Sequence, residues 1–239
     1  MGKNKLRRFA ENETFRCLVQ PEFDDIFGKD HPLKGRWRED FFGNDNPVIL
    51  ELGCGKGEYT VGLARLYEDR NFIGVDIKGA RMWTCAKTVN DDGIANAAFL
   101  RTRIEFINSF FAEGEVDEIW ITFADPQLKK GRAKKRLTSP FFLSRYASFM
   151  KPDGAVNLKT DSLHLHLYSK AVAEANELPV ETALTDIYNH GEELPAELVG
   201  IKTTYETRFL GEGKPITYLR FTLGGKRSFE DPCFEPDMM

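Results

Sequence analysis

The residues with the clearest chemical pattern form a glycine-rich turn, Gly53, Gly55 and Gly57, with Glu51 just before it. Glycine has no Cβ atom, so the turn lets a ligand approach the backbone and tolerates positive φ angles. An apolar run precedes the turn and helix-spaced apolar residues follow it, which predicts a strand, a turn and a helix whose first amides face the ligand. We expect a small-molecule site here; a glycine turn that binds nothing is the alternative.

The spacing of these glycines distinguishes two classes of cofactor. Dinucleotide-binding folds use G-x-G-x-x-G beside a pyrophosphate, whereas this chain has E-x-G-x-G-x-G followed by Glu58. That pattern resembles motif I of the class I S-adenosylmethionine-dependent methyltransferases. S-adenosylmethionine has no phosphate and carries a sulfonium cation, so an acid beside the turn suits it. The resemblance implies that Glu51, Gly53, Gly55 and Gly57 bind this cofactor.

Two further positions are expected to contact the cofactor. Asp76 ends the next predicted strand about twenty residues beyond the glycine turn, where such folds place the acid that accepts hydrogen bonds from the ribose hydroxyls. A turn-forming aspartate is the alternative. The third predicted strand ends near residues 100–103, beside the expected adenine, and Arg103 is included there.

Asp125 is the second anchor of the pattern. The strand predicted for VDEIWITFADP has to stop at Pro126, because proline cannot continue a ladder of hydrogen bonds. Asp125 is therefore expected at the carboxyl end of the strand adjacent to the glycine turn, at the switch point where doubly wound folds bind ligands. A turn or helix-cap aspartate is the alternative. A dense basic run follows it: Lys129, Lys130, Arg132, Lys134, Lys135 and Arg136.

Four separated motifs now resemble one family. The glycine turn, FADPQLKKGRAKKRLTSPFFL, LKTD at 158–161 and TTYETRF at 203–209 are similar, in this order, to the bacterial tRNA (guanine(46)-N7)-methyltransferases, over residues 48–223. The resemblance implies transfer of a methyl group from S-adenosylmethionine to N7 of a guanosine in tRNA, at position 46 of the variable loop. Relatives commonly have tryptophan and then proline or histidine after the Asp-Pro pair, where this chain has Gln127 and Leu128.

The resemblance also implies roles for individual residues. Asp125 is expected to be catalytic and to contact the cofactor. Substrate contacts are expected at Lys129, Asp161, Thr203, Thr204, Tyr205 and Glu206, and tRNA phosphate contacts at Lys130, Arg132, Lys134, Lys135 and Arg136. An N-cap of the helix that begins near Leu163 is the alternative for Asp161. Guanine N7 carries a lone pair and no proton, so alignment and electrostatics would supply the catalysis without a general base.

The composition fits such an enzyme. A chain of 239 residues, 41% of them hydrophobic, is long enough for one α/β domain with a large core. The net charge of −4 does not itself indicate nucleic-acid binding, so the clustering of basic residues carries that argument. A second basic cluster lies at Lys3, Lys5, Arg7 and Arg8, for which a solvated tail is the alternative.

Other features exclude some classes of protein. The four cysteines are scattered without a C-x-x-C pair, which indicates reduced thiols and no metal site. His164 and His166 lie two apart on a predicted helix, face different directions and are not expected to bind metal. No apolar run of membrane-spanning length and no secretory signal is found, so a cytoplasmic protein is expected, as a monomer or a homodimer.

The order of predicted elements defines the fold. Strands are expected at residues 48–52, 71–76, about 97–103, 116–126, 155–159, 180–188 and 216–223, with helices up to about 68 and at 79–90, 106–111 and 163–177. Their order predicts an α/β fold with a mostly parallel doubly wound sheet and an antiparallel C-terminal strand pair, which resembles the Rossmann-like fold of class I methyltransferases. Residues 1–45 are expected to be a basic, partly irregular N-terminal extension, 46–225 the methyltransferase domain and 226–239 a tail.

Three rival functions remain at this point. A methyltransferase acting on another RNA base would share every motif above. An inactive RNA-binding protein on this fold predicts damage to the cofactor motif, which is intact here. A nicotinamide-dependent oxidoreductase is disfavoured by the glycine spacing and by the basic run.

Overall fold

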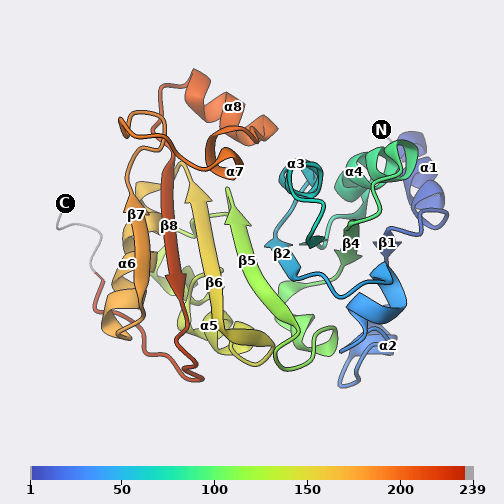
Figure 1. The fold of residues 1–239 in the computed structure, drawn as a ribbon, viewed down its shortest axis with the longest axis horizontal. Coiled ribbons are helices and arrows are strands. Elements are labelled where there is room, and N and C mark those ends of the chain that lie inside the picture. Colours follow the sequence, from blue (N-terminus) through green and yellow to red (C-terminus); the bar gives the residue numbers. More distant parts are fainter. Residues whose placement is uncertain (1, 235–239) are drawn as a thin grey trace.

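An eight-stranded sheet forms the centre of the computed structural model, which describes residues 2–234 (Figure 1). The strand order is β1-β4-β3-β2-β5-β6-β8-β7. The strands are β1 (Leu18–Val19), β2 (Val48–Leu52), β3 (Asn71–Asp76), β4 (Ala97–Arg101), β5 (Val116–Thr122), β6 (Met150–Thr160), β7 (Val180–Leu184) and β8 (Thr217–Thr222). The strands from β1 to β6 pair in parallel, and β8 runs antiparallel to both β6 and β7. This confirms the predicted class I methyltransferase fold.

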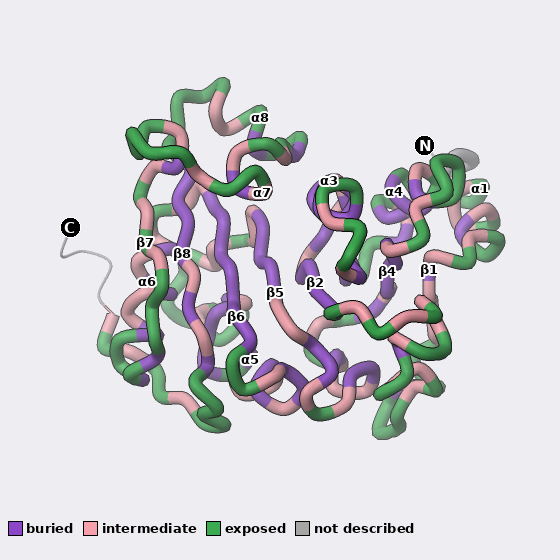
Figure 2. Tube along the Cα trace, in the orientation of Figure 1, coloured by how far each residue is buried: buried purple, intermediate pink, exposed green. Residues whose placement is uncertain are grey.

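Helices cover both faces of the sheet. They are α1 (Gly2–Asn12), α2 (Phe23–Ile26), a π-helix (Trp37–Phe42), α3 (Glu58–Leu66), α4 (Gly79–Asp92), 3-10 helices at Ile104–Ser109 and Lys130–Lys135, α5 (Pro140–Tyr146), α6 (Leu163–Ala175), α7 (Ala196–Val199) and α8 (Thr204–Gly211). Side chains alternate between faces along a strand: Leu50 of β2 joins the core under α5 and α6, and Ile49 joins the core under α3 and α4. Strand β2 is therefore buried on both sides (Figure 2).

The N-terminal segment contains more regular structure than its sequence indicated. Helix α1 packs against α4, and the short strand β1 extends the sheet beside β4. Trp37 is fully buried, and its Nε1 donates to the carbonyl oxygen of Phe110 at 2.9 Å. The aromatic residues of this segment show no helical or strand period, so the pattern alone did not predict its elements.

Several predicted boundaries were wrong, and each has a local cause. Strand β5 ends at Thr122, before its predicted end at 126. Phe123 adopts a positive φ of 49°, which takes the backbone out of the ladder of hydrogen bonds. Strand β6 begins at Met150, five residues before the predicted start at 155. The helix expected at 106–111 is a 3-10 helix at Ile104–Ser109, and α7 lies between the last two predicted strands, where no helix was predicted.

The three glycines of the turn have different structural roles. All of them have positive φ angles, of 80° at Gly53, 59° at Gly55 and 70° at Gly57. A Cβ atom at Gly57 would lie 2.4 Å from Sγ of Cys85 and 2.6 Å from the ring of Phe99. Gly57 therefore allows α3 to pack on the sheet, whereas the space beside the other two glycines is open.

Replacing Gly57 should test this packing role. We expect Gly57→Ala to lower the free energy of unfolding by about 2–4 kcal/mol, since it adds the clash to the cost of a left-handed backbone. Gly93→Ala is the matched control, because Gly93 has a φ of 65° and open space around its Cα. It should cost only about 1 kcal/mol. Equal losses in urea denaturation of the two variants would contradict the packing argument.

Candidate active site

A cleft lies at the carboxyl ends of the parallel strands and is bordered by α8. Its main cavity, of about 680 Å³, is lined by the glycine turn, the ends of β3 and β5 and the start of α8. A second cavity, of about 540 Å³, adjoins it. The two share Gly53, Asp76, Ile77, Ile104, Gln127, Lys135 and Leu137. The predicted glycine turn, Asp76 and Asp125 are thus brought to one place.

Glu51 lies on the floor of the cleft and is almost fully buried. One carboxylate oxygen accepts the backbone amide of Thr60 at 2.9 Å and the hydroxyl of the same residue. The other accepts the hydroxyl of Thr122 at 2.6 Å. Burial raises the pKa of Glu51 to about 7, against the lowering effect of these donors. Its charge is therefore sensitive to pH near neutrality.

Asp76 fixes the shape of the glycine turn. Its two carboxylate oxygens accept the backbone amides of Gly55, at 3.0 Å, and of Lys78, at 2.8 Å. The side chain is partly exposed and lines both cavities. Asp76 thus has a structural role here that does not occupy all of its acceptor capacity, since each carboxylate oxygen has a second lone pair.

The cleft has the chemical character that a nucleoside with a cationic amino-acid end requires. A Cβ atom added at Gly55 would meet only the carbonyl oxygen of Gly53, at 4.0 Å, so the turn leaves room for a ligand against the backbone. Glu51 and Asp76 line the cleft beside this turn. Phe141, Phe142 and Arg103 line the second cavity but not the first. These residues fit S-adenosylmethionine.

Asp125 is exposed on a loop that lines the cleft. One of its carboxylate oxygens accepts the backbone amide of Gln127 at 3.0 Å. Phe123 and Gln127, two residues to either side, both have positive φ angles, of 49° and 47°. Such angles are uncommon for residues other than glycine. Asp125 is therefore held on a strained loop and not on the strand end that the sequence indicated.

The basic run forms the exposed rim beside Asp125. Lys135 lines the cleft, and Lys129, Lys130, Arg132 and Lys134 are also exposed. Arg136 is the exception, and its position disagrees with the phosphate contact predicted for it. Only 3% of it is exposed, and its guanidinium donates to backbone carbonyl oxygens inside the protein. It is thus withdrawn from the surface that a phosphate could reach.

Helix α8 forms the opposite wall. Thr203 caps the helix by accepting the amide of Glu206 at 3.1 Å, and both Thr203 and Tyr205 line the cleft. The backbone amide of Thr204 donates to Glu58 at 2.8 Å, which joins α8 to the start of α3.

Asp161 also lines the cleft. The alternative that it caps α6 is wrong, because Ser162 caps this helix by accepting the amide of Leu165.

Glu206 does not face the cleft. It is fully buried, and it forms an ion pair with the equally buried Lys159 at 2.8 Å and accepts the hydroxyl of Tyr188 at 2.8 Å. Burial lowers the pKa of Lys159, and Glu206 opposes that shift. Lys159 is a supporting residue that the sequence analysis missed. Its signal was a lysine within the predicted strand 155–159, directly after Leu158.

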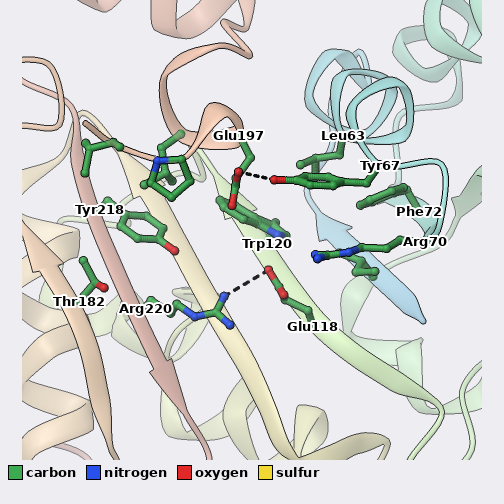
Figure 3. Close-up of a pocket in the computed structure, with 14 residues that line it drawn as sticks. Leu63, Tyr67, Arg70, Phe72, Glu118, Trp120, Thr182, Glu197, Tyr218 and Arg220 are labelled. Atoms are coloured by element: carbon green, nitrogen blue, oxygen red, sulfur yellow. Dashed lines mark hydrogen bonds and ion pairs between the residues drawn. The ribbon is translucent and has the colours of Figure 1, made fainter. Parts of the chain in front are cut away.

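A separate cavity of about 340 Å³ lies on the face of the sheet between α3 and α7 (Figure 3). Tyr67, Arg70 and Trp120 line it, and Glu118 forms an ion pair with Arg220 at 3.3 Å. It contains none of the predicted site residues.

Within residues 2–234, no helix is long and apolar enough to cross a membrane, and no group of three or more His, Cys, Asp or Glu side chains is placed to hold a metal ion.

The sheet order, the glycine turn and the cleft at the strand ends define a class I methyltransferase. A solved structure of similar fold is a 16S rRNA (adenine(1408)-N(1))-methyltransferase from Catenulisporales acidiphilia with its cosubstrate SAM. Its TM-score is 0.54 at 16% identity, covering 80% of this chain and 92% of that one. The chain also matches the family described as "Putative methyltransferase" over residues 45–219.

Sequence relatives define the family more narrowly. A protein of Christiangramia forsetii named tRNA (guanine-N(7)-)-methyltransferase is 52% identical, covering 93% of this chain and 99% of the relative. One of the same name from Bacteroides thetaiotaomicron is 48% identical, covering 100% and 93%. The chain belongs to the family of tRNA (guanine-N(7)-)-methyltransferases, as its motifs indicated.

The buried ion pair of α8 can be tested by a double-mutant cycle. We expect Lys159→Met and Glu206→Met each to lower the free energy of unfolding by about 3–5 kcal/mol, because each leaves one charge buried and unpaired. The double variant should recover most of that loss, since two methionines fill the space without charge. Urea denaturation measures all four proteins. Additive losses in the double variant would contradict the pairing.

Proposed function

We propose that this enzyme transfers a methyl group from S-adenosylmethionine to N7 of a guanosine in tRNA, at position 46 of the variable loop. The observation that carries the proposal is the cleft itself. It combines an acidic glycine turn that fits S-adenosylmethionine with an exposed Asp125 and a basic rim. The names of the relatives agree with it. Position 46 rests on the family resemblance alone.

Each end of the cofactor has candidate partners. S-adenosylmethionine supplies a methyl group on a positively charged sulfur atom. Glu51 provides negative charge on the floor of the cleft, and Asp76 offers free lone pairs to the ribose hydroxyls. Arg103 and Ile104 border the apolar cavity proposed for the adenine. Gly53 and Gly55 keep the backbone open beside these groups.

The target nitrogen needs no proton removed. Guanine N7 has a free lone pair in the major-groove edge, so the protein has to align it and stabilise the positive charge that develops on the base. Asp125 is exposed at the cleft and can do either, by its charge or by accepting hydrogen bonds from guanine N1 and N2. Asp161, Thr203 and Tyr205 line the same space and are the proposed substrate contacts.

The remaining residues act on the tRNA or support the wall. Lys129 is proposed to contact the substrate, and the exposed side chains of Lys130, Arg132, Lys134 and Lys135 to contact phosphates, which give affinity without sequence information. The backbone amide of Thr204 donates a hydrogen bond to Glu58 at the edge of the cleft. For Glu206 we propose an indirect role, in which its ion pair with Lys159 fixes α8 so that Thr203 and Tyr205 face the substrate.

The direct test uses unmodified tRNA transcripts and methyl-labelled S-adenosylmethionine. Label should appear as N7-methylguanosine, mapped by cleavage at that base, and should vanish in a transcript whose guanosine 46 is replaced by adenosine. Label on another RNA base would identify a different substrate. Binding of both S-adenosylhomocysteine and tRNA without any transfer would identify an inactive RNA-binding protein.

Replacing Asp125 distinguishes catalysis from base recognition. We expect Asp125→Asn to lower kcat by about 10²-fold with little change in binding, the range seen when a site loses one electrostatic contact to the transition state. If Asp125 mainly reads the guanine donors, the amide should instead raise KM for tRNA. Single-turnover rates at saturation separate the two, and a rate equal to that of the unaltered protein would remove Asp125 from catalysis.

The pKa of Glu51 predicts how cofactor affinity depends on pH. Because burial raises this pKa to about 7, Glu51 is ionised above pH 7 and becomes protonated below it. We expect the Kd for S-adenosylmethionine to rise up to about tenfold from pH 8 to pH 6, as the negative charge is lost. Calorimetry on Glu51→Gln, which has no charge to lose, is the control. The same pH dependence in that variant would exclude Glu51 as its source.

A further inference from the structure

Arg136 is the one member of the basic run that points into the protein. Its Nε donates to the carbonyl oxygen of Pro126 at 3.1 Å, and its Nη2 donates to that of Gln127 at 3.1 Å. The guanidinium lies 4.1 Å from the ring centre of Tyr168. It also lies 2.9 Å from Nε2 of His164, which has to be the acceptor because an arginine only donates. These contacts surround the side chain.

The two carbonyl groups belong to the loop that carries Asp125. The loop begins with a positive φ at Phe123 and ends with a positive φ at Gln127. Non-glycine residues persist in this conformation only where surrounding contacts hold them. The hydrogen bond from the amide of Gln127 to Asp125 is one such contact. The amide of Phe123, which donates to the carbonyl oxygen of Lys159 at 2.9 Å, is a second. The guanidinium of Arg136, which binds two consecutive carbonyls directly after Asp125, is a third.

We propose that Arg136 is a positioning residue, which holds the loop of residues 123–127 in its strained conformation so that Asp125 faces the cleft. This rests on the proposed function for the role of Asp125. The proposal gives Arg136 a different role from its neighbours in the basic run. Arg136 acts on the backbone of the loop, whereas Lys134 is proposed to contact the tRNA.

Lysine cannot replace Arg136 in this role. A guanidinium presents Nε and Nη donors in a fixed plane, so it can bind two carbonyls while its face rests on an aromatic ring. An ammonium group is a single point charge. A phosphate contact, by contrast, tolerates either residue, since the attraction depends mainly on charge. The variant Arg136→Lys therefore distinguishes the two roles.

The experiment compares Arg136→Lys and Arg136→Met with Lys134→Met, in single-turnover kinetics on tRNA and in tRNA binding over a range of salt. Both Arg136 variants should lower the rate at saturation by about 30-fold or more. Their tRNA affinity should change less than about threefold, with an unaltered salt slope. Lys134→Met should weaken tRNA binding and reduce the salt slope by somewhat less than one.

Two further measurements exclude a merely structural effect. The stoichiometry of S-adenosylhomocysteine binding corrects each rate for the folded fraction, and Arg136→Lys carries the test if Arg136→Met does not fold. Combining Arg136→Lys with Asp125→Asn should cost little beyond Asp125→Asn alone, because both changes act through one carboxylate. Independent losses that multiply would overturn the proposal.

A normal saturated rate in Arg136→Lys, with a reduced salt slope in Arg136→Met, would also overturn it and make Arg136 a phosphate contact. The proposed function fails separately, if the unaltered enzyme forms no N7-methylguanosine in tRNA. Hydrogen exchange then still tests the loop. The amides of residues 123–125, 127 and 128 should exchange faster in Arg136→Lys than in the unaltered protein, and unchanged exchange would refute the positioning role.

Discussion

The buried carboxylate of Glu51 joins the three elements from which the cleft is built. It sits at the end of β2 and accepts donors from Thr60 on α3 and from Thr122 at the end of β5. The sheet order reverses direction around β2, with β3 on one side and β5 on the other, and this leaves a crevice at the strand ends. Asp76 then fixes the glycine turn from β3. Both acids thus shape the site before any ligand enters, and negative charge is placed in the crevice as a result.

Two buried cations support the walls of this crevice from behind. Lys159 holds α8 through Glu206, and Arg136 holds the loop of Asp125 through two carbonyl groups. Burying charge is costly unless every donor finds a partner, so such groups define one arrangement of the segments they join. Each cation acts on a segment that has few apolar side chains of its own in the core. Geometry near the substrate therefore depends on polar contacts that lie outside the cleft.

The sequence predicted the sheet and the glycine turn well because their signals are local. The apolar run of 48–52, the alternating glycines and Asp76 lie within one stretch, and their positions follow from strand and helix periods. The roles within the basic run were not readable in this way. Lys135 and Arg136 are adjacent and both cationic, and only the packing against Tyr168 shows which one is buried. Glu206 was likewise assigned to the substrate by resemblance, because a sequence motif records that a residue is present and not which way it points.

The loop geometry accommodates Gln127, at the position where the sequence resemblance implies a tryptophan. The backbone of Gln127 is fully used: its amide donates to Asp125, and its carbonyl oxygen accepts from Arg136. Its φ of 47° is a property of the backbone as well. Neither hydrogen bond depends on the chemistry of the side chain, which lines the cleft. Position 127 can therefore change its side chain while it keeps Asp125 in place, and the side chain is free to alter the surface that the substrate meets.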